Sequence, residues 1–272
     1  MSLDEGNGHM TAEARTPGAD GPPAALRYRR RLTLRHAVRE LWSSRALVLT
    51  LAERDLRVRY KQAVLGFAWS ILNPIVLLVA FTIIFEHAAH IDTGGAPYPL
   101  FSYLGLLPWT FFSGAVNTGS QSIVAEQSLL NKVYFPREAF PLGDIMVAAA
   151  DTVMASLALV LLFLVEGFVP RATSYWVPVF IPIAVAFAVG VTLATSSMLV
   201  YLRDVRQALP IVMQLGLFAT PVAYAFTVIP TNLQPVYAVV NPLGPVIDGL
   251  RQTVLYGHAP HPLPLIVAAV SS

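Results

Sequence analysis

The chain has 272 residues, of which 55% are hydrophobic and 12% are charged, and its mean hydropathy is +0.60. Soluble domains carry about 25% charged residues, so a soluble globular protein is excluded and a multi-span membrane protein is predicted. The net charge is only +2, yet 12 of the 18 lysines and arginines lie in residues 1–61. This basic end suits lipid headgroups, and nucleic-acid binding is hard to reconcile with the apolar remainder. The absence of cysteine excludes disulfides, thiolate nucleophiles and cysteine-based metal sites.

Residues 1–40 are predicted to form a disordered basic tail in the cytoplasm, because a Gly-, Pro- and Ala-containing start is followed by an arginine-rich run. Residues 41–62 contain no Pro or Gly and favour a helix. At 100° per residue, Leu49, Ala52 and Leu56 fall on one face, away from the basic side chains. We expect an amphipathic helix in the cytoplasmic interface, and a helix continuous with the first span is the alternative. The basic residues next to the span are Arg54, Arg57, Arg59 and Lys61.

The first membrane span is predicted between Lys61 and Glu86, where 24 residues carry no charge. An apolar helix needs about 20 residues to cross the hydrocarbon core, and the basic residues before it place the N-terminus in the cytoplasm. All basic residues except Arg171 and Arg251 then fall in cytoplasmic parts. The sixth apolar segment has only about ten residues, which is too few to cross a bilayer. We therefore expect a fragment or a truncated chain whose last span is incomplete. The later apolar segments are 100–123, 141–165, 175–202 and 208–226, with a sixth from Pro262 onward.

The stretch 227–261 is too apolar for a surface loop, and its prolines prevent one continuous span. Two short helices dipping into the outer leaflet, at 233–240 and 245–255, would satisfy its backbone. The predicted fold is therefore all-α: a polytopic membrane protein with six transmembrane helices, an N-terminal interface helix and re-entrant external helices. Residues 41–272 form its transmembrane domain.

No catalytic residue is predicted in this chain. The segments 114–119 and 244–249 have the glycine spacing of a phosphate loop but lack its lysine, so any ATP chemistry must come from a partner. Asp144 and Asp151 lie seven residues apart on one face of a helix, where acids serve either structure or a proton relay. No metal site is predicted, because loop histidines three residues apart are common. These histidines are His87 with His90, and His258 with His261.

Aromatic residues gather at the ends of the predicted spans, and anchoring at the membrane interface explains most of them. Aromatic faces also stack on sugar rings, so some of these side chains are candidates for a glycan path. The candidates are Trp69, Trp109, Phe111, Phe112 and Tyr201.

Three motifs stand out: the run 54–66 at the first span, Asn131-Lys-Val-Tyr-Phe-Pro-Arg-Glu138 in the first inside loop, and Asn241-Pro-Leu-Gly-Pro245 followed by Asp248 and Arg251. Together they resemble the permease subunits of type 2 ABC exporters for lipid-linked polysaccharides. That family includes O-antigen, teichoic acid and mycobacterial galactan exporters. The resemblance covers the chain from about Leu41 onward.

The resemblance implies that two copies pair around a channel and that each docks a separate ATPase subunit, which holds ATP and Mg. It also implies that the first inside loop contacts the ATPase. The implied substrate is a polyprenyl-pyrophosphate-linked glycan, whose pyrophosphate the basic residues before the first span would attract; headgroup anchoring explains them equally well. The implied coupling residues are Lys132, Tyr134, Phe135, Pro136, Arg137 and Glu138.

We therefore expect a multi-pass permease of a bacterial plasma membrane that exports a lipid-linked polysaccharide with an ATPase partner. Abundant Ala, Arg and Pro suggest a GC-rich source such as an actinobacterium, which makes a galactan one candidate glycan. The alternatives are an ABC permease for a drug or small lipid, a proton-coupled carrier using Asp151, and a membrane-embedded glycosyltransferase using Asp144. Accumulation of lipid-linked glycan inside cells lacking the protein would favour the exporter.

Overall fold

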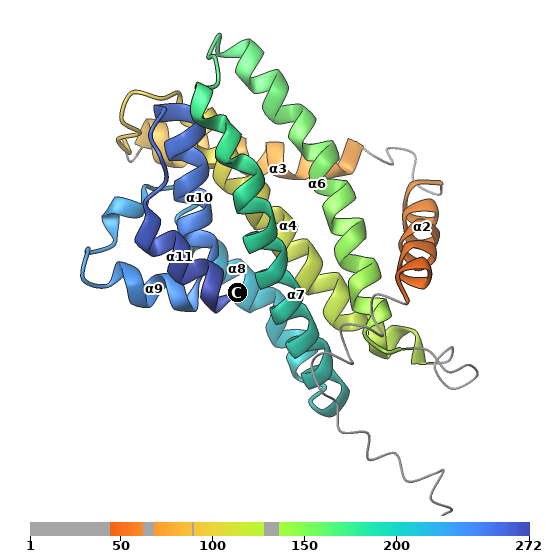
Figure 1. Ribbon diagram of the computed structural model, residues 1–272. Coiled ribbons are helices and arrows are strands. Elements are labelled where there is room, and N and C mark those ends of the chain that lie inside the picture. Colours follow the sequence, from red (N-terminus) through yellow and green to blue (C-terminus); the bar gives the residue numbers. More distant parts are fainter. Residues whose placement is uncertain (1–43, 62–67, 89, 128–135) are drawn as a thin grey trace, which may run out of the picture. The chain divides into compact units, whose positions relative to one another are not determined.

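The computed structural model describes residues 44–61, 68–88, 90–127 and 136–272, and every regular element in these ranges is a helix (Figure 1). The all-α prediction is confirmed, while the predicted tail 1–40 lies outside the described residues. The elements are α2 (Arg45–Lys61), α3 (Ala68–Phe81), η2 (Thr82–Ala88), α4 (Tyr98–Ala125), α6 (Ala139–Val165), η3 (Ala172–Trp176), α7 (Val177–Tyr201), α8 (Val205–Ala219), η4 (Phe226–Val228), α9 (Gln234–Val240), α10 (Leu243–Arg251), η5 (Gln252–Tyr256) and α11 (Pro262–Ser271).

Helices occupy all six segments that the sequence marks as apolar. Among the described residues, three stretches have the length and composition to cross a membrane: Ala68–His87, Ala139–Val165 and Ala172–Tyr201. With 28 residues α4 is also long enough, but it carries more polar residues than those three. The helices α8 and α11 are shorter, with 15 and 10 residues. The chain is thus a polytopic helical membrane protein.

The fifth apolar segment ends earlier than the prediction, which extended it to residue 226. The helix α8 stops at Ala219, because Thr220 precedes Pro221 and a residue before proline avoids helical backbone. Thr220 is extended, with φ −84° and ψ 140°. The chain then turns, and Val222 and Ala223 are buried in that turn.

The central helix is α4, which packs against α6 and α7 and also contacts α3, α8 and α10. Gly119 lets α7 approach closely, since a Cβ there would lie 2.6 Å from Cγ2 of Thr192. Farther along, the rings of Phe112 and Phe187 stack with centroids 4.8 Å apart. Most of the buried core surrounds this helix.

The predicted pair of short helices before the last segment is confirmed as α9 and α10. Proline sits in the first turn of α9, and the chain breaks between the two helices at Asn241 and Pro242. From α10 the backbone continues into η5, which ends at Gly257 in the left-handed conformation with φ 77°. That these helices dip into a membrane leaflet stays a prediction.

Arg251, the last residue of α10, is 1% exposed. Its guanidinium donates hydrogen bonds to four backbone carbonyls and lies 3.6 Å from the centroid of the Phe101 ring. The arginine therefore joins α10 to α4 and to the turn after α8. The accepting oxygens belong to Phe101, Pro221, Val222 and Tyr224.

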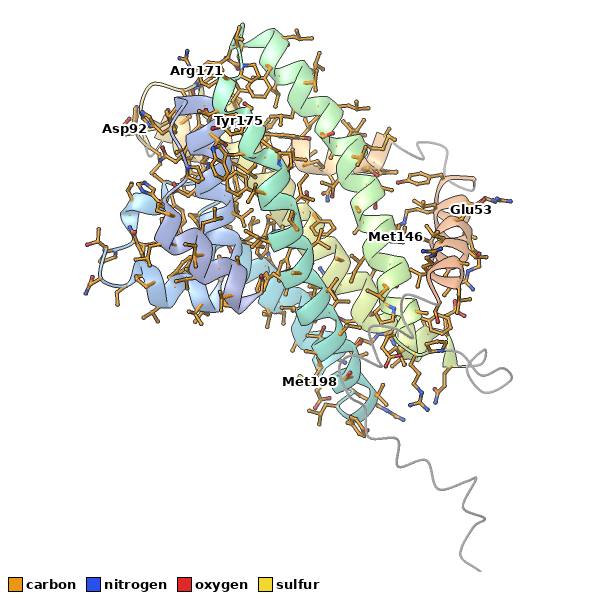
Figure 2. All side chains as sticks on the ribbon, in the orientation of Figure 1. Glu53, Asp92, Met146, Arg171, Tyr175 and Met198 are labelled. Atoms are coloured by element: carbon orange, nitrogen blue, oxygen red, sulfur yellow. The ribbon has the colours of Figure 1, made fainter. Side chains whose placement is uncertain are left out.

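Segments predicted to lie outside the membrane on the same side meet in space. Arg171 donates its backbone N–H to the carbonyl of Val254 at 3.0 Å, and the Tyr256 hydroxyl donates to the carbonyl of Thr93. Figure 2 shows Arg171 at one end of the long helices and Met198 near the opposite end of α7.

The segments predicted to be cytoplasmic also meet, at the other ends of these helices. Arg54 of α2 pairs with Glu126 after α4 at 2.7 Å, and Arg206 of α8 donates at 3.0 Å to the side chain of Gln121, near the end of the second predicted span. The grouping of the loops agrees with the predicted topology. Which end faces the cytoplasm stays a prediction.

Candidate functional site

The helix α2 lies beside the first half of α6 (Figure 1). At one end Leu51 packs over Gly143, where a Cβ would lie 3.4 Å from that of Leu51. Eight residues later on both helices, Arg59 reaches Asp151. The equal spacing means that the two helices run in the same direction over about 12 Å.

The buried face of α2 differs from the predicted one. Leu49 is 53% exposed, while Val48, Leu51 and Ala52 are buried. Together with Ala139 and Phe140 of α6, Val48 and Leu51 form a small apolar cluster of their own. Periodicity located the apolar stripe to within one residue, but the position of α6 decides which side of that stripe is covered.

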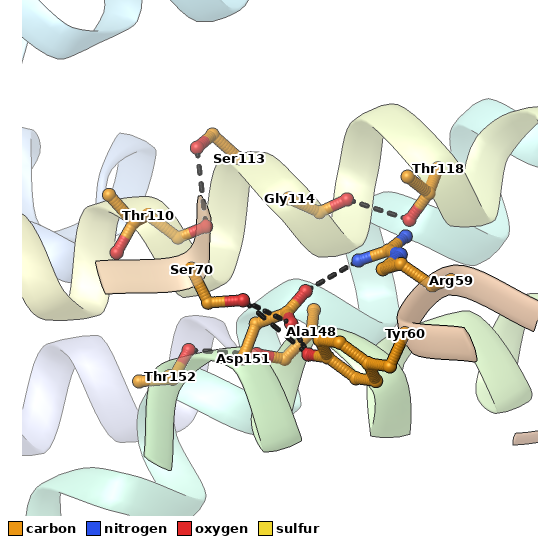
Figure 3. Close-up of polar contacts among 10 residues, drawn as sticks. All are labelled: Arg59, Tyr60, Ser70, Thr110, Ser113, Gly114, Thr118, Ala148, Asp151 and Thr152. Atoms are coloured by element: carbon orange, nitrogen blue, oxygen red, sulfur yellow. Dashed lines mark hydrogen bonds and ion pairs between the residues drawn. The ribbon is translucent and has the colours of Figure 1, made fainter. Parts of the chain in front are cut away.

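Asp151 is the polar centre of the contact between α2, α3 and α6 (Figure 3). Its carboxylate accepts a hydrogen bond from Arg59 Nη1 at 2.5 Å and from Ser70 Oγ at 2.8 Å. The Tyr60 hydroxyl donates to the same carboxylate. Burial raises the pKa of Tyr60, and the hydrogen bond to Asp151 adds to that effect, so the phenol stays protonated and able to donate.

A cavity of about 480 Å³ adjoins this carboxylate. It offers a guanidinium, a hydroxyl, a side-chain amide and an aromatic ring, in Arg59, Tyr60, Asn73 and Trp69. Trp69 is 59% exposed, so its ring is accessible. A site that combines a cation, an exposed aromatic face and an amide group suits a phosphorylated sugar. The remaining lining residues are Ser70, Pro74, Thr110, Gly114, Ala148, Asp151, Thr152 and Ala155.

A second ionic contact fastens α2 to the end of α4. Arg54 pairs with Asp55 at 2.8 Å and with Glu126 at 2.7 Å, and these hydrogen bonds, the one to Asp55 foremost, raise its pKa. A cavity of about 180 Å³ beside it is also lined by Asp144. Asp144 and Asp151 thus both face α2, in agreement with their placement on one face of the third span.

The three predicted basic candidates of α2 whose side chains the structure describes already have carboxylate partners. Arg59 pairs with Asp151, and Arg57 pairs with Glu53 one turn earlier. Lys61 is the last residue of α2, and its side chain is not among the described atoms. An anionic ligand of these arginines must therefore compete with carboxylates.

The predicted aromatic candidates do not share one surface. Trp69 lines the cavity beside Asp151, and Trp109 lines a different groove between α4 and α8. Phe111 and Phe112 are buried in the core, and Tyr201 is 85% exposed at the end of α7. Their role on a glycan path stays a prediction.

The predicted coupling loop is described only from Pro136 onward. Arg137 and Glu138 are exposed directly before α6, whose first residues pack on Val48 and Leu51 of α2. The start of α6 therefore connects the end of this loop to α2. Lys132, Tyr134 and Phe135 lie outside the described residues.

Gly143→Val tests the close packing of α2 on α6. We expect it to lower the free energy of unfolding by about 1–3 kcal/mol, because the added side chain meets Leu51 and the backbone of Ala52. Thermal unfolding in detergent measures the change. Gly190→Val is the control, since Gly190 is exposed and its added Cβ would meet only the Ser272 carbonyl, at 3.7 Å. Equal losses in both variants would contradict close packing at Gly143.

Sequence reasoning missed Tyr60, Ser70 and Asn73 as site residues. The sequence does contain a signal for these residues, because they are polar side chains that lie just before and within the first charge-free span. Polar groups inside a span usually have a partner or line a cavity. Only the tertiary structure shows that these side chains face Asp151 and its cavity.

The structure combines apolar helices of spanning length, a polar helix at their centre and a charged cavity beside it. These features define a polytopic integral membrane protein with the features of a transport subunit. The profile of the ABC-2 type transporter family matches residues 46–255. The chain belongs to this family of transporter permeases, as the sequence motifs indicate.

Several curated proteins are similar to the chain. It is 29% identical over 237 residues to the O-antigen export system permease protein RfbA of Myxococcus xanthus, covering 86% of this chain and 90% of that protein. It is 27% identical over 212 residues to the O-antigen export system permease protein RfbA of Klebsiella pneumoniae, covering 78% and 81%. It is 25% identical over 213 residues to the polysialic acid transport protein KpsM of Escherichia coli, covering 75% and 80%.

Proposed function

We propose that this chain is the permease subunit of an ATP-driven exporter that moves a polyprenyl-pyrophosphate-linked polysaccharide across a bacterial plasma membrane. The observation that carries the proposal is the family match over residues 46–255, together with relatives named for O-antigen export and polysialic acid transport. The chain acts as a homodimer, and its N-terminus is cytoplasmic. A galactan is one candidate for the glycan.

The cavity beside Asp151 supports a phosphorylated sugar as the group first bound. Arg59 supplies a guanidinium that pairs with phosphate in a two-pronged geometry, and Trp69 supplies an exposed ring on which a sugar stacks. A pyrophosphate competes with Asp151 for Arg59. Arg54, Arg57 and Lys61 add positive charge along the same helix and hold the anionic headgroup near the cavity.

Energy comes from a separate ATPase subunit that binds ATP and Mg. The loop containing Lys132, Tyr134 and Phe135 and ending in Pro136, Arg137 and Glu138 docks on that subunit. Movement of the loop reaches the cavity through the start of α6, because Phe140 packs on α2 and α2 carries Arg59. In this role the chain carries out no covalent chemistry on the glycan.

ATP hydrolysis by the protein purified with its ATPase partner tests this function. We expect lipid-linked glycan to stimulate the wild-type complex. Phe135→Ala and Arg137→Ala should lower the stimulated rate by about tenfold, as the loss of a central interface side chain does. Arg171→Ala is the matched control, because it removes an exposed arginine at the opposite end of the long helices.

The outcomes separate the candidate functions. If no ATPase co-purifies, or if both loop variants hydrolyse ATP at the wild-type rate, the exporter proposal fails and a carrier using Asp151 is the next hypothesis. If ATPase activity responds to a drug or small lipid but not to lipid-linked glycan, the chain exports that other substrate. Size-exclusion profiles of the variants confirm that each is folded.

A further inference from the structure

The central helix α4 is unusually polar for a helix among membrane spans. Between Thr110 and Ser122 it carries seven uncharged polar residues. Several of them donate to carbonyls of their own helix, such as Ser113 to Thr110 and Thr118 to Gly114 (Figure 3). Polar side chains at membrane depth face a protein partner or a water-filled path.

One polar row of α4 faces a groove shared with α8. Trp109, Ser113, Asn117 and Gln121 follow one another at intervals of four residues, so they lie along one side of the helix. They line a groove of about 340 Å³ whose opposite wall includes Gln214 of α8. From Trp109 to Gln121 the row extends about 18 Å, more than half the thickness of the hydrocarbon core.

One amide of this row, that of Asn117, has a hydrogen-bond acceptor without a partner. In the part of the chain that the structure describes, Oδ1 of Asn117 is buried and accepts no hydrogen bond. A buried acceptor without a partner is costly, so a donor from water or from a ligand is expected there. Gln121 is held in place, since its Nε2 donates to the Asn117 carbonyl at 3.0 Å and its Oε1 accepts from Arg206 at 3.0 Å.

Trp109 closes the groove rather than offering a stacking face. It is 5% exposed, and its ring lies against Gly216 of α8, where a Cβ would come within 2.8 Å of Cη2. The polar surface of the groove therefore comes from the Ser113 hydroxyl and the side-chain amides, beside the apolar side chains of Pro210, Met213 and Leu217 of α8. Sugar hydroxyls both donate and accept, so a row of amides suits them, whereas an acyl or prenyl chain would leave these amides unpaired.

Resting on the proposed function, we propose that the groove between α4 and α8 is a second binding site, which holds uncharged sugar units of the exported chain. Asn117, Gln121 and Gln214 hydrogen-bond to the sugar hydroxyls. This site is distinct from the cavity beside Asp151, whose arginine suits the phosphate end of the same molecule. Sugar units would occupy the groove while α4 separates them from that cavity.

Single cysteines test this site with no labelling background from this chain, because its sequence contains no cysteine. The groove variants are Asn117→Cys and Gln214→Cys, probed with a water-soluble, membrane-impermeant thiol reagent on the complex with its ATPase. Asn232→Cys in an exposed loop is the accessible control, and Leu161→Cys, 59% exposed on the apolar helix α6, is the lipid-facing control. We expect groove cysteines to react at rates near that of Asn232→Cys and about a hundredfold faster than Leu161→Cys, since a thiol in hydrocarbon does not ionise.

Protection from labelling identifies the ligand. The probes are the lipid-linked glycan extracted from cells depleted of the protein, the water-soluble polysaccharide released from it by mild acid, and polyprenyl phosphate alone. We expect the intact glycan to slow labelling of the groove cysteines by about tenfold at ten times its Kd. Polyprenyl phosphate should leave the rate unchanged, and the released polysaccharide should protect at a higher concentration.

Three results would overturn the site. Groove cysteines that react as slowly as Leu161→Cys would mean that lipid covers the groove. Protection by polyprenyl phosphate alone would mean that the groove holds the lipid chain. Disulfides between Gln214→Cys copies, with no protection by glycan, would mean that a second copy of the chain covers it.

Export measured in cells separates this site from the proposed function. If cells lacking the protein keep their surface polysaccharide, the exporter function fails. If they lose it but glycan does not protect the groove, only the groove site fails.

Ser113→Ala should slow export roughly three- to tenfold, whereas Ser156→Ala should not, although both serines bond to the carbonyl three residues earlier in a helix.

Discussion

Arg251→Met is expected to remove most of the folded protein. Arg251 is fully buried, and its guanidinium is the donor for four backbone carbonyls from α4 and from the turn after α8. Each buried acceptor left unpaired costs about 1–3 kcal/mol, so we expect unfolding to become easier by at least about 3–5 kcal/mol. Thermal unfolding and the yield of monodisperse protein in detergent measure the loss.

Two further variants make this result specific to Arg251. Arg251→Lys should recover only a small part of the stability, because an ammonium cannot reach four carbonyls arranged around a planar guanidinium. Arg203→Met removes an exposed arginine at the turn between α7 and α8 and should change the stability by less than about 0.5 kcal/mol. A wild-type melting temperature for Arg251→Met would show that the carbonyls do not depend on this side chain.

The space for Arg251 also depends on Gly105. A Cβ at Gly105 would lie 2.7 Å from Nη2 of Arg251 and 2.9 Å from the carbonyl oxygen of Val222. The glycine lets α4 approach the turn after α8, and the arginine then fills the remaining polar gap. This arrangement is what positions α8, and therefore one wall of the groove proposed to bind sugar.

The second large effect is expected for the pair Arg59 and Asp151. Asp151 accepts from three donors on two other elements, so removing its charge should loosen α2 from both α3 and α6. In a double-mutant cycle with Arg59→Gln and Asp151→Asn, we expect a coupling free energy of about 1–3 kcal/mol. Unfolding in detergent gives the four stabilities, and basal ATP hydrolysis of the complex gives the effect on function.

The pair Arg57 and Glu53 on the same helix is the matched comparison. Both of its side chains are more than 60% exposed, at 67% and 68%, whereas Asp151 is 24% exposed. An exposed pair one helical turn apart contributes about 0.3–0.5 kcal/mol. Equal coupling in the two cycles would show that Asp151 does not hold α2 in place.

The helix α2 connects the predicted coupling loop to the cavity beside Asp151. Its first half packs on the start of α6 beside the end of the predicted coupling loop, and its second half brings Arg59 to the cavity. The ion pair of Arg54 with Glu126 attaches α2 to the end of α4, where the same loop begins. A variant that frees α2 is therefore expected to change both substrate access and its coupling to ATP hydrolysis.

The sequence by itself determined the helical class, the positions of the apolar segments and the grouping of the loops. These follow from local physics: a span needs an uninterrupted apolar run, and proline and basic residues mark where it stops. The short helices α9 and α10 were predictable for the same reason, because Pro242 and its neighbours forbid one continuous helix. The end of α8 differs from the prediction because Thr220 precedes Pro221 and leaves the helical conformation.

Only the tertiary structure decided which polar residues act together. Periodicity placed Asp144 and Asp151 on one face but did not identify α2 as the helix that this face meets. It marked Trp69 and Trp109 alike, although one lines a charged cavity and the other packs against Gly216. Partners such as Arg59 and Asp151 are 92 residues apart in sequence, and contacts of that range depend on how whole helices pack rather than on any local pattern.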